Sequence, residues 1–132
     1  MKIIGASALA AVTLVIWTAP ILGHHSFATQ YDANKPVEMK GAVTKVEWTN
    51  PHARFYIDVK NAQGQVENWN FEMASPNVLA RNGWKRTTLK IGDQITVAGY
   101  LARSADRMAI AGALTDASGK PLFASSATDL AR

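Results

Sequence analysis

Apolar and polar residues alternate strictly in RFYIDVK at residues 54–60, and in the neighbouring segment VENWNFEM at residues 66–73 Asn68, Asn70 and Glu72 alternate with Trp69, Phe71 and Met73. Successive side chains of a β-strand point to opposite faces, so this period predicts two strands that each bury one face. The polar loop NAQG between them predicts a β-hairpin. The inward side chains would be those of Phe55, Ile57, Val59, Trp69, Phe71 and Met73.

A third alternating segment precedes this hairpin, and its phase changes at Gly41. Val37, Met39 and Val43 share one face, whereas Ala42, Thr44, Val46 and Trp48 share the other. A glycine at such a change predicts a bulge or a sharp bend, by which one long strand can take part in two sheets.

The period changes again after the hairpin. In SPNVLARNG, Ser75 suits an N-cap, Pro76 the first helical position and Gly83 the residue after the helix end, which predicts a helix of about two turns. Residues 94–102 and 107–115 predict two further strands, separated by RSAD, and residues 116–123 a turn with a short last strand. This order predicts an all-β fold with one short helix, an OB-like five-stranded β-barrel; an open β-sandwich is the alternative.

The first residues indicate the cellular location of the protein. Met1 and Lys2 precede the uncharged run IIGASALAAVTLVIW, which is typical of a secretory signal peptide. We predict cleavage between Gly23 and His24 and a periplasmic or secreted protein with no membrane span; an uncleaved anchor is the alternative. The predicted organisation is a signal peptide at 1–23, a tail at 24–36 that reverses direction near residues 33–35, a barrel at 37–123 and a frayed tail at 124–132.

Composition excludes some classes of protein. The chain has no cysteine, so neither a disulfide scaffold nor a lipid attached through cysteine is available. Its formal net charge is +4, to which Lys2 contributes one, and this mild excess says little about partners. Arg81, Lys85, Arg86 and Lys90 are grouped after the helix, but export argues against a nucleic-acid partner.

The three histidines form the sharpest candidate site. Cleavage after Gly23 would make His24 the N-terminus, whose α-amine and ring nitrogen can chelate a metal, and a further imidazole from His25 or His52 would complete a nitrogen set that suits Cu(II). A tail that runs back along the first strand could bring these rings together. The alternative is that His24 and His25 are solvated and that His52 belongs only to the turn TNPHA.

Aromatic and polar residues offer a second candidate site. Trp48 ends a strand beside the NPH turn and Trp84 follows the helix, so both, with Asn50, could line a ligand cleft. No nucleophile–base pair or paired carboxylates with an orienting group stand out: Ser26 lies beside His25 only in sequence, and Glu47 and Glu72 are ordinary strand residues. We therefore expect a protein that is not an enzyme.

Several stretches of the sequence resemble a family of small exported bacterial proteins known only as a domain of unknown function. The matching stretches are HHSFATQYD, KPVEMKGAVTKVEWTNPH, NWNFE, SPNVLARNGW and LKIGDQITVAGY. The resemblance implies an exported β-rich domain that begins at or beside the histidine pair, and it implies no activity. One departure is the loop ARSADRM, where a glycine-containing turn is expected.

Two functions remain open. One is an exported binding or structural module that recognises a small molecule, a metal or an envelope partner. The other is a copper-binding protein that uses His24 with His25, His52 or both.

Overall fold

A computed structural model describes residues 27–124 of the chain. The predicted signal peptide, its cleavage site, His24, His25 and most of the C-terminal tail lie outside these residues. The elements are α1 (Phe27–Gln30), β1 (Tyr31–Glu47), β2 (Arg54–Lys60), β3 (Val66–Glu72), α2 (Pro76–Arg81), β4 (Gln94–Ala102), β5 (Met108–Asp116) and β6 (Pro121–Ala124). Within this part of the chain, no helix has the length and apolar character needed to cross a bilayer.

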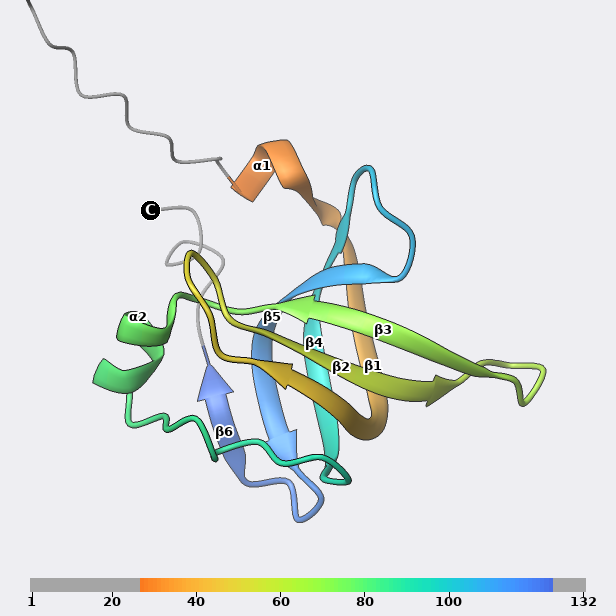
Figure 1. The fold of residues 1–132 in the computed structure, drawn as a ribbon. Coiled ribbons are helices and arrows are strands. Elements are labelled where there is room, and N and C mark those ends of the chain that lie inside the picture. Colours follow the sequence, from red (N-terminus) through yellow and green to blue (C-terminus); the bar gives the residue numbers. More distant parts are fainter. Residues whose placement is uncertain (1–26, 125–132) are drawn as a thin grey trace, which may run out of the picture.

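Five of the strands close into a barrel (Figure 1). Strand β1 pairs with β2 and with β4, β2 pairs with β3, and β4 pairs with β5, all antiparallel. A parallel pairing of β3 with β5 completes the ring. This order, with α2 between β3 and β4, is that of an OB fold and confirms the predicted barrel rather than the open sandwich. Strand β6 adds to the outer edge of β5.

Gly41 is where β1 passes from one side of the barrel to the other, as its phase change predicts. Residues up to Ala42 pair with β4, and residues from Ala42 onward pair with β2. A side chain at position 41 would place its Cβ atom 2.3 Å from the carbonyl oxygen of Asp58. Only glycine lets the two strands approach this closely.

The N-terminal part of the domain differs from the expectation of a tail with a reversal near residues 33–35. Residues 27–30 form α1, and β1 begins at Tyr31. Turn chemistry is present, because the Asp32 carboxylate accepts a hydrogen bond from the Asn34 N–H. It produces a bulge, however: the register slips between Tyr31 and Pro36 while the chain continues along β4.

Helix α2 closes one end of the barrel, as its sequence signals predict. The Ser75 hydroxyl accepts a hydrogen bond from the Val78 N–H, and Gly83 takes a φ of 85° just after the helix. The Trp84 N–H then donates to the Leu79 carbonyl, which turns the chain back towards the barrel. Leu79 and Trp84 therefore join the core, which also contains Val43, Phe55, Ile57, Phe71, Met73, Ile95, Val97 and Leu114.

Candidate functional site

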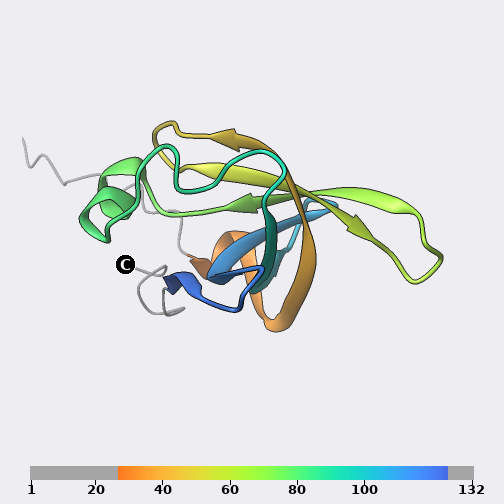
Figure 2. The ribbon, with the colours of Figure 1, turned by 90° about the horizontal axis from the view of Figure 1, so that it is seen from below.

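The outer face of the β2–β3 hairpin carries an unbroken set of polar side chains. The strands pair in register, so Arg54 lies opposite Glu72, Tyr56 opposite Asn70 and Asp58 opposite Asn68. Their neighbours in sequence point into the core. This hairpin extends beyond the barrel in both views of the ribbon (Figures 1 and 2).

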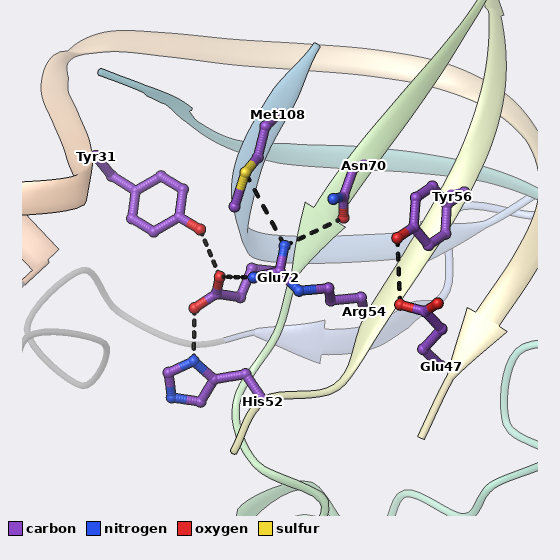
Figure 3. A network of polar contacts seen from close by, with 8 residues as sticks. All are labelled: Tyr31, Glu47, His52, Arg54, Tyr56, Asn70, Glu72 and Met108. Atoms are coloured by element: carbon purple, nitrogen blue, oxygen red, sulfur yellow. Dashed lines mark hydrogen bonds and ion pairs between the residues drawn. The ribbon is translucent and has the colours of Figure 1, made fainter. Parts of the chain in front are cut away.

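Glu72 is the centre of a polar network that we call the Glu72 cluster: Tyr31, His52, Arg54 and Glu72 (Figure 3). The Tyr31 hydroxyl and the Arg54 guanidinium donate to the Glu72 Oε2 atom at 2.7 and 2.6 Å. The His52 Nδ1 atom lies 2.6 Å from the Glu72 Oε1 atom. Glu72 is only 3 % exposed, so its burial depends on these three partners.

Each partner reaches Glu72 from a different element. Tyr31 follows α1 directly, and its ring packs beside Phe27, whose ring in turn meets Tyr100 edge-on. His52 lies in the β1–β2 loop, which the Ala53 backbone ties to Met73 and Ala74 just beyond β3. Arg54 begins β2 and faces Glu72 across the hairpin. The Glu72 cluster therefore joins α1, the β1–β2 loop and the hairpin at one end of the barrel.

Tyr31 allows the Glu72 cluster to be tested through pH. Burial first, and the hydrogen bond to Glu72 second, raise the pKa of the Tyr31 phenol above its ordinary value of 10.0. Above that pH the unfolded chain loses a proton that the folded protein keeps, so stability is complete below about pH 10 and falls as the pH rises further. We expect this group to remove about 1.4 kcal/mol of unfolding free energy per pH unit.

The comparison with Tyr31→Phe isolates this effect. Urea unfolding between about pH 10 and pH 12 should show a steeper loss of stability in the natural protein than in the variant. The pKa of Tyr56 is also raised, by burial and by its hydrogen bond to Glu47, but Tyr56 is present in both proteins. Equal slopes would contradict the burial of a hydrogen-bonded phenol at position 31.

Beside the Glu72 cluster lies a pocket that we call the polar pocket. Its volume is about 650 Å³. Its walls are Tyr56, Asn68, Asn70, Asp106 and Arg107, so the outer face of the hairpin forms one side and the β4–β5 turn the other. The Arg54 guanidinium connects the two sites, because it contacts the Asn70 Oδ1 atom at 3.5 Å as well as Glu72 (Figure 3).

Some wall residues of the polar pocket are fixed by their neighbours and others are free to bind. The Asn68 amide donates to Thr44 and Asp58, and the Tyr56 hydroxyl donates to Glu47 at 3.2 Å. Within residues 27–124, the side chains of Asp106 and Arg107 have no hydrogen-bond or ion-pair partner. The polar pocket therefore combines a preorganised wall with an exposed acid and an exposed base.

The residues predicted from the sequence are distributed over different surroundings. His52 is half-exposed and bound to Glu72, whereas His24 and His25 lie outside the described residues. Within 27–124, no group of three acidic or histidine side chains is placed to hold a metal ion. Trp48 packs partly against the core, and Asn50 is exposed in the same loop.

Trp84 requires a correction. It is 5 % exposed and belongs to the core, so it lines no open cleft. The expectation rested on its place just after the helix, but the hydrogen bond from its N–H to the Leu79 carbonyl brings the indole inward.

Sequence reasoning missed both sites that the fold assembles. Residues 54, 56 and 58 and residues 68, 70 and 72 are the polar positions of two alternating segments, and alternation alone predicts that each set shares one face. The register that pairs Arg54 with Glu72 was the missing information. No local signal points to Tyr31 or Arg107, because each meets the hairpin only through closure of the barrel.

The sequence matches no curated protein. Among solved structures, the chain is similar to the N-terminal domain of PriB from Thermoanaerobacter tencongensis, at 20% identity over 63% of this chain and 96% of that one, with a TM-score of 0.48. It is also similar to the mitochondrial single-stranded DNA-binding protein Rim1 from S. cerevisiae, at 9% identity over 68% and 95%, with a TM-score of 0.47.

These neighbours correct one expectation. Export was taken to exclude a nucleic-acid partner, and that exclusion is wrong, because similar structures include single-stranded DNA-binding proteins. The likeness is one of fold and assigns no ligand to this chain.

The sequence comparison settles the family. The predicted resemblance was to exported proteins with a domain of unknown function, on motifs spread over residues 24–100. The model of a family of unknown function, DUF6152, matches residues 11–111, which is most of the chain. The protein belongs to the DUF6152 family.

Proposed function

We propose that this protein is an exported, non-catalytic binding module of the bacterial envelope, and that it holds its ligand on the outer face of the β2–β3 hairpin. The signal-like segment at residues 1–23 supports export. The barrel supports a binding role, because OB folds recognise chain-like ligands on this face and on the loops that flank it.

The polar pocket is the observation that carries this proposal. It lies where the hairpin face meets the β4–β5 turn, and its volume of about 650 Å³ is large enough for a small ligand or one segment of a polymer. Its walls offer the Tyr56 ring, the Asn70 amide and the side chains of Asp106 and Arg107 in the turn. The Glu72 cluster fixes one end of the same face through Arg54.

Chemical-shift mapping tests the binding face. The isotope-labelled protein is titrated with a panel of neutral oligosaccharides, acidic oligosaccharides and single-stranded oligothymidylate. At least one probe should shift signals of β2, β3 and the β4–β5 turn together. Asn70→Ala should lower the affinity for that probe by about tenfold, which corresponds to the loss of one hydrogen bond.

Asn77→Ala is the matched control, because Asn77 is exposed on α2, away from the polar pocket. It should leave the affinity unchanged. Shifts confined to α2 or β6, or equal affinities of the two variants, would contradict the proposed face.

Export has its own test. The full chain is expressed in a bacterium, and the intact mass of the protein in the periplasmic fraction is measured. The expected mass is that of a chain that begins at His24. A protein that stays in the cytoplasm would refute export, and one that keeps residues 1–23 would refute cleavage after Gly23. Both outcomes would leave the binding face untouched.

Copper binding is the second candidate, and the contact between His52 and Glu72 favours it. Histidines that bind metals usually bond a carboxylate through their other ring nitrogen, which orients the ring. Here Glu72 engages Nδ1, and the side chain is 50 % exposed, so Nε2 is available as a ligand. Tyr31 contacts the other oxygen of the same carboxylate. Residues 24–26 precede α1 and span up to about 10 Å when fully extended, so the new N-terminus could approach this cluster.

A titration of the mature protein with Cu(II) tests this candidate. We expect one equivalent to bind, and His24→Ala or His52→Ala to weaken it by at least about tenfold, since each variant removes a nitrogen ligand. The mature protein with an acetylated N-terminus should also bind weakly, because acetylation removes the α-amine as a ligand. Equal binding by the acetylated protein would exclude the α-amine as a ligand.

A further inference from the structure

Arg107 has an unusual backbone. Its φ is 50°, and it is the only residue other than glycine with a positive φ within residues 27–124. The four others, Gly64, Gly83, Gly92 and Gly119, lack the Cβ atom that makes this region unfavourable.

Closure of the barrel holds Arg107 in this conformation. The Asn70 N–H donates to the Arg107 carbonyl at 2.9 Å, and the next residue, Met108, pairs with Asn70 where β3 and β5 meet. Nothing in these contacts needs an arginine side chain, because both use the backbone. Strain that glycine would avoid is typically kept where the side chain serves function.

The side chain at this position enters the polar pocket beside an acid. Asp106 and Arg107 are adjacent, and both are among the wall residues. Arg54 is committed to Glu72, Lys45 is paired with Glu47, and Asp58 and Lys60 add one charge of each sign further along β2. The charges of the face therefore balance, which suits an uncharged ligand that needs both donors and acceptors.

Resting on the binding face proposed above, we infer that the polar pocket binds a neutral saccharide and that Asp106 and Arg107 clasp its hydroxyl groups. A carboxylate accepts two hydroxyl hydrogen bonds, a guanidinium donates in a planar fork, and the Asn70 amide does both. The Lys45 ammonium lies over one face of the Tyr56 ring, 5.1 Å from its centroid, and the other face supplies an apolar surface for the carbon face of a sugar. A polyanion would instead draw its affinity from unpaired cations, at a cost that grows with salt.

The experiment compares neutral oligosaccharides with oligothymidylate by calorimetry, using chitohexaose, cellohexaose and maltohexaose as the saccharide probes. One saccharide should bind with an affinity that is unchanged between about 0.05 and 0.5 M salt. Arg107→Gly should lower the affinity for this saccharide by at least about tenfold. The same variant should melt at the same temperature as the natural protein or higher, because glycine relieves the strain.

Two matched variants sharpen the result. Asp106→Asn keeps the shape of the side chain and should also lower the affinity for the saccharide. Arg81→Ala removes an exposed arginine from α2 and should leave this affinity unchanged. A lower melting temperature for Arg107→Gly would refute the strain argument. Unchanged saccharide binding by that variant would refute the clasp.

The remaining outcomes separate this inference from the proposed function. If oligothymidylate binds the same face with a steep salt dependence and no saccharide does, the saccharide inference is refuted and the proposed binding face is supported. If no probe binds the face at all, both fall.

Discussion

Glu72→Ala is expected to lower the free energy of unfolding by about 3 kcal/mol. The substitution leaves the Tyr31 hydroxyl, in a side chain that is 2 % exposed, without the acceptor that it now has at 2.7 Å. It also leaves the Arg54 guanidinium without its carboxylate. His52 and Arg54 can regain water because they are partly exposed, so most of the cost comes from the buried phenol and the cavity.

Urea unfolding followed by tryptophan fluorescence measures this loss. Glu72→Gln retains an acceptor oxygen and the shape of the side chain, so its loss should be smaller than that of Glu72→Ala. Glu38→Ala is the control: Glu38 is exposed on β1, and its loss should stay within about 0.5 kcal/mol. If Glu72→Ala unfolded at the same urea concentration as this control, the Glu72 cluster would not stabilise the fold.

The barrel could be predicted from the sequence because its signals are local. Alternation fixes which side of β2 and β3 faces the core, and Ser75, Pro76 and Gly83 mark the ends of α2. Gly41 marks the point where β1 changes partners. Each of these signals acts within a few residues, so none depends on knowing the rest of the fold.

The candidate sites could not be predicted in the same way, since they depend on contacts between distant residues. Tyr31 and Glu72 are 41 residues apart, and Glu72 reads as an ordinary outward residue of a strand. It is buried because α1 and Tyr31 cover the end of β3, where the sequence indicated a tail. Similarly, Arg107 meets Asn70 only through the parallel pairing of β3 with β5.

Gly99→Ala is expected to destabilise the protein by roughly 2–3 kcal/mol, because it forces extra volume into a close backbone contact. Gly99 lies in the middle of β4, between Val37 of β1 and Ala111 of β5. A Cβ atom at this position would lie 1.9 Å from the carbonyl oxygen of Ile110. The β4–β5 register shifts at this point, so the strands are already bent around the glycine.

The proper control separates this contact from the general cost of replacing a glycine. Gly64→Ala has open space around the new atom and only the cost of a positive φ, about 1 kcal/mol. Gly99→Ala should cost clearly more in urea unfolding. The displaced Ile110 pairs with Glu72 across β3 and β5, so the NMR signals of Tyr31 and His52 should also shift in Gly99→Ala and not in Gly64→Ala. Equal stabilities of the two variants would mean that β4 can move away from β5 without a loss of unfolding free energy. The closed barrel that assembles both candidate sites would then be looser than its strand pairing indicates.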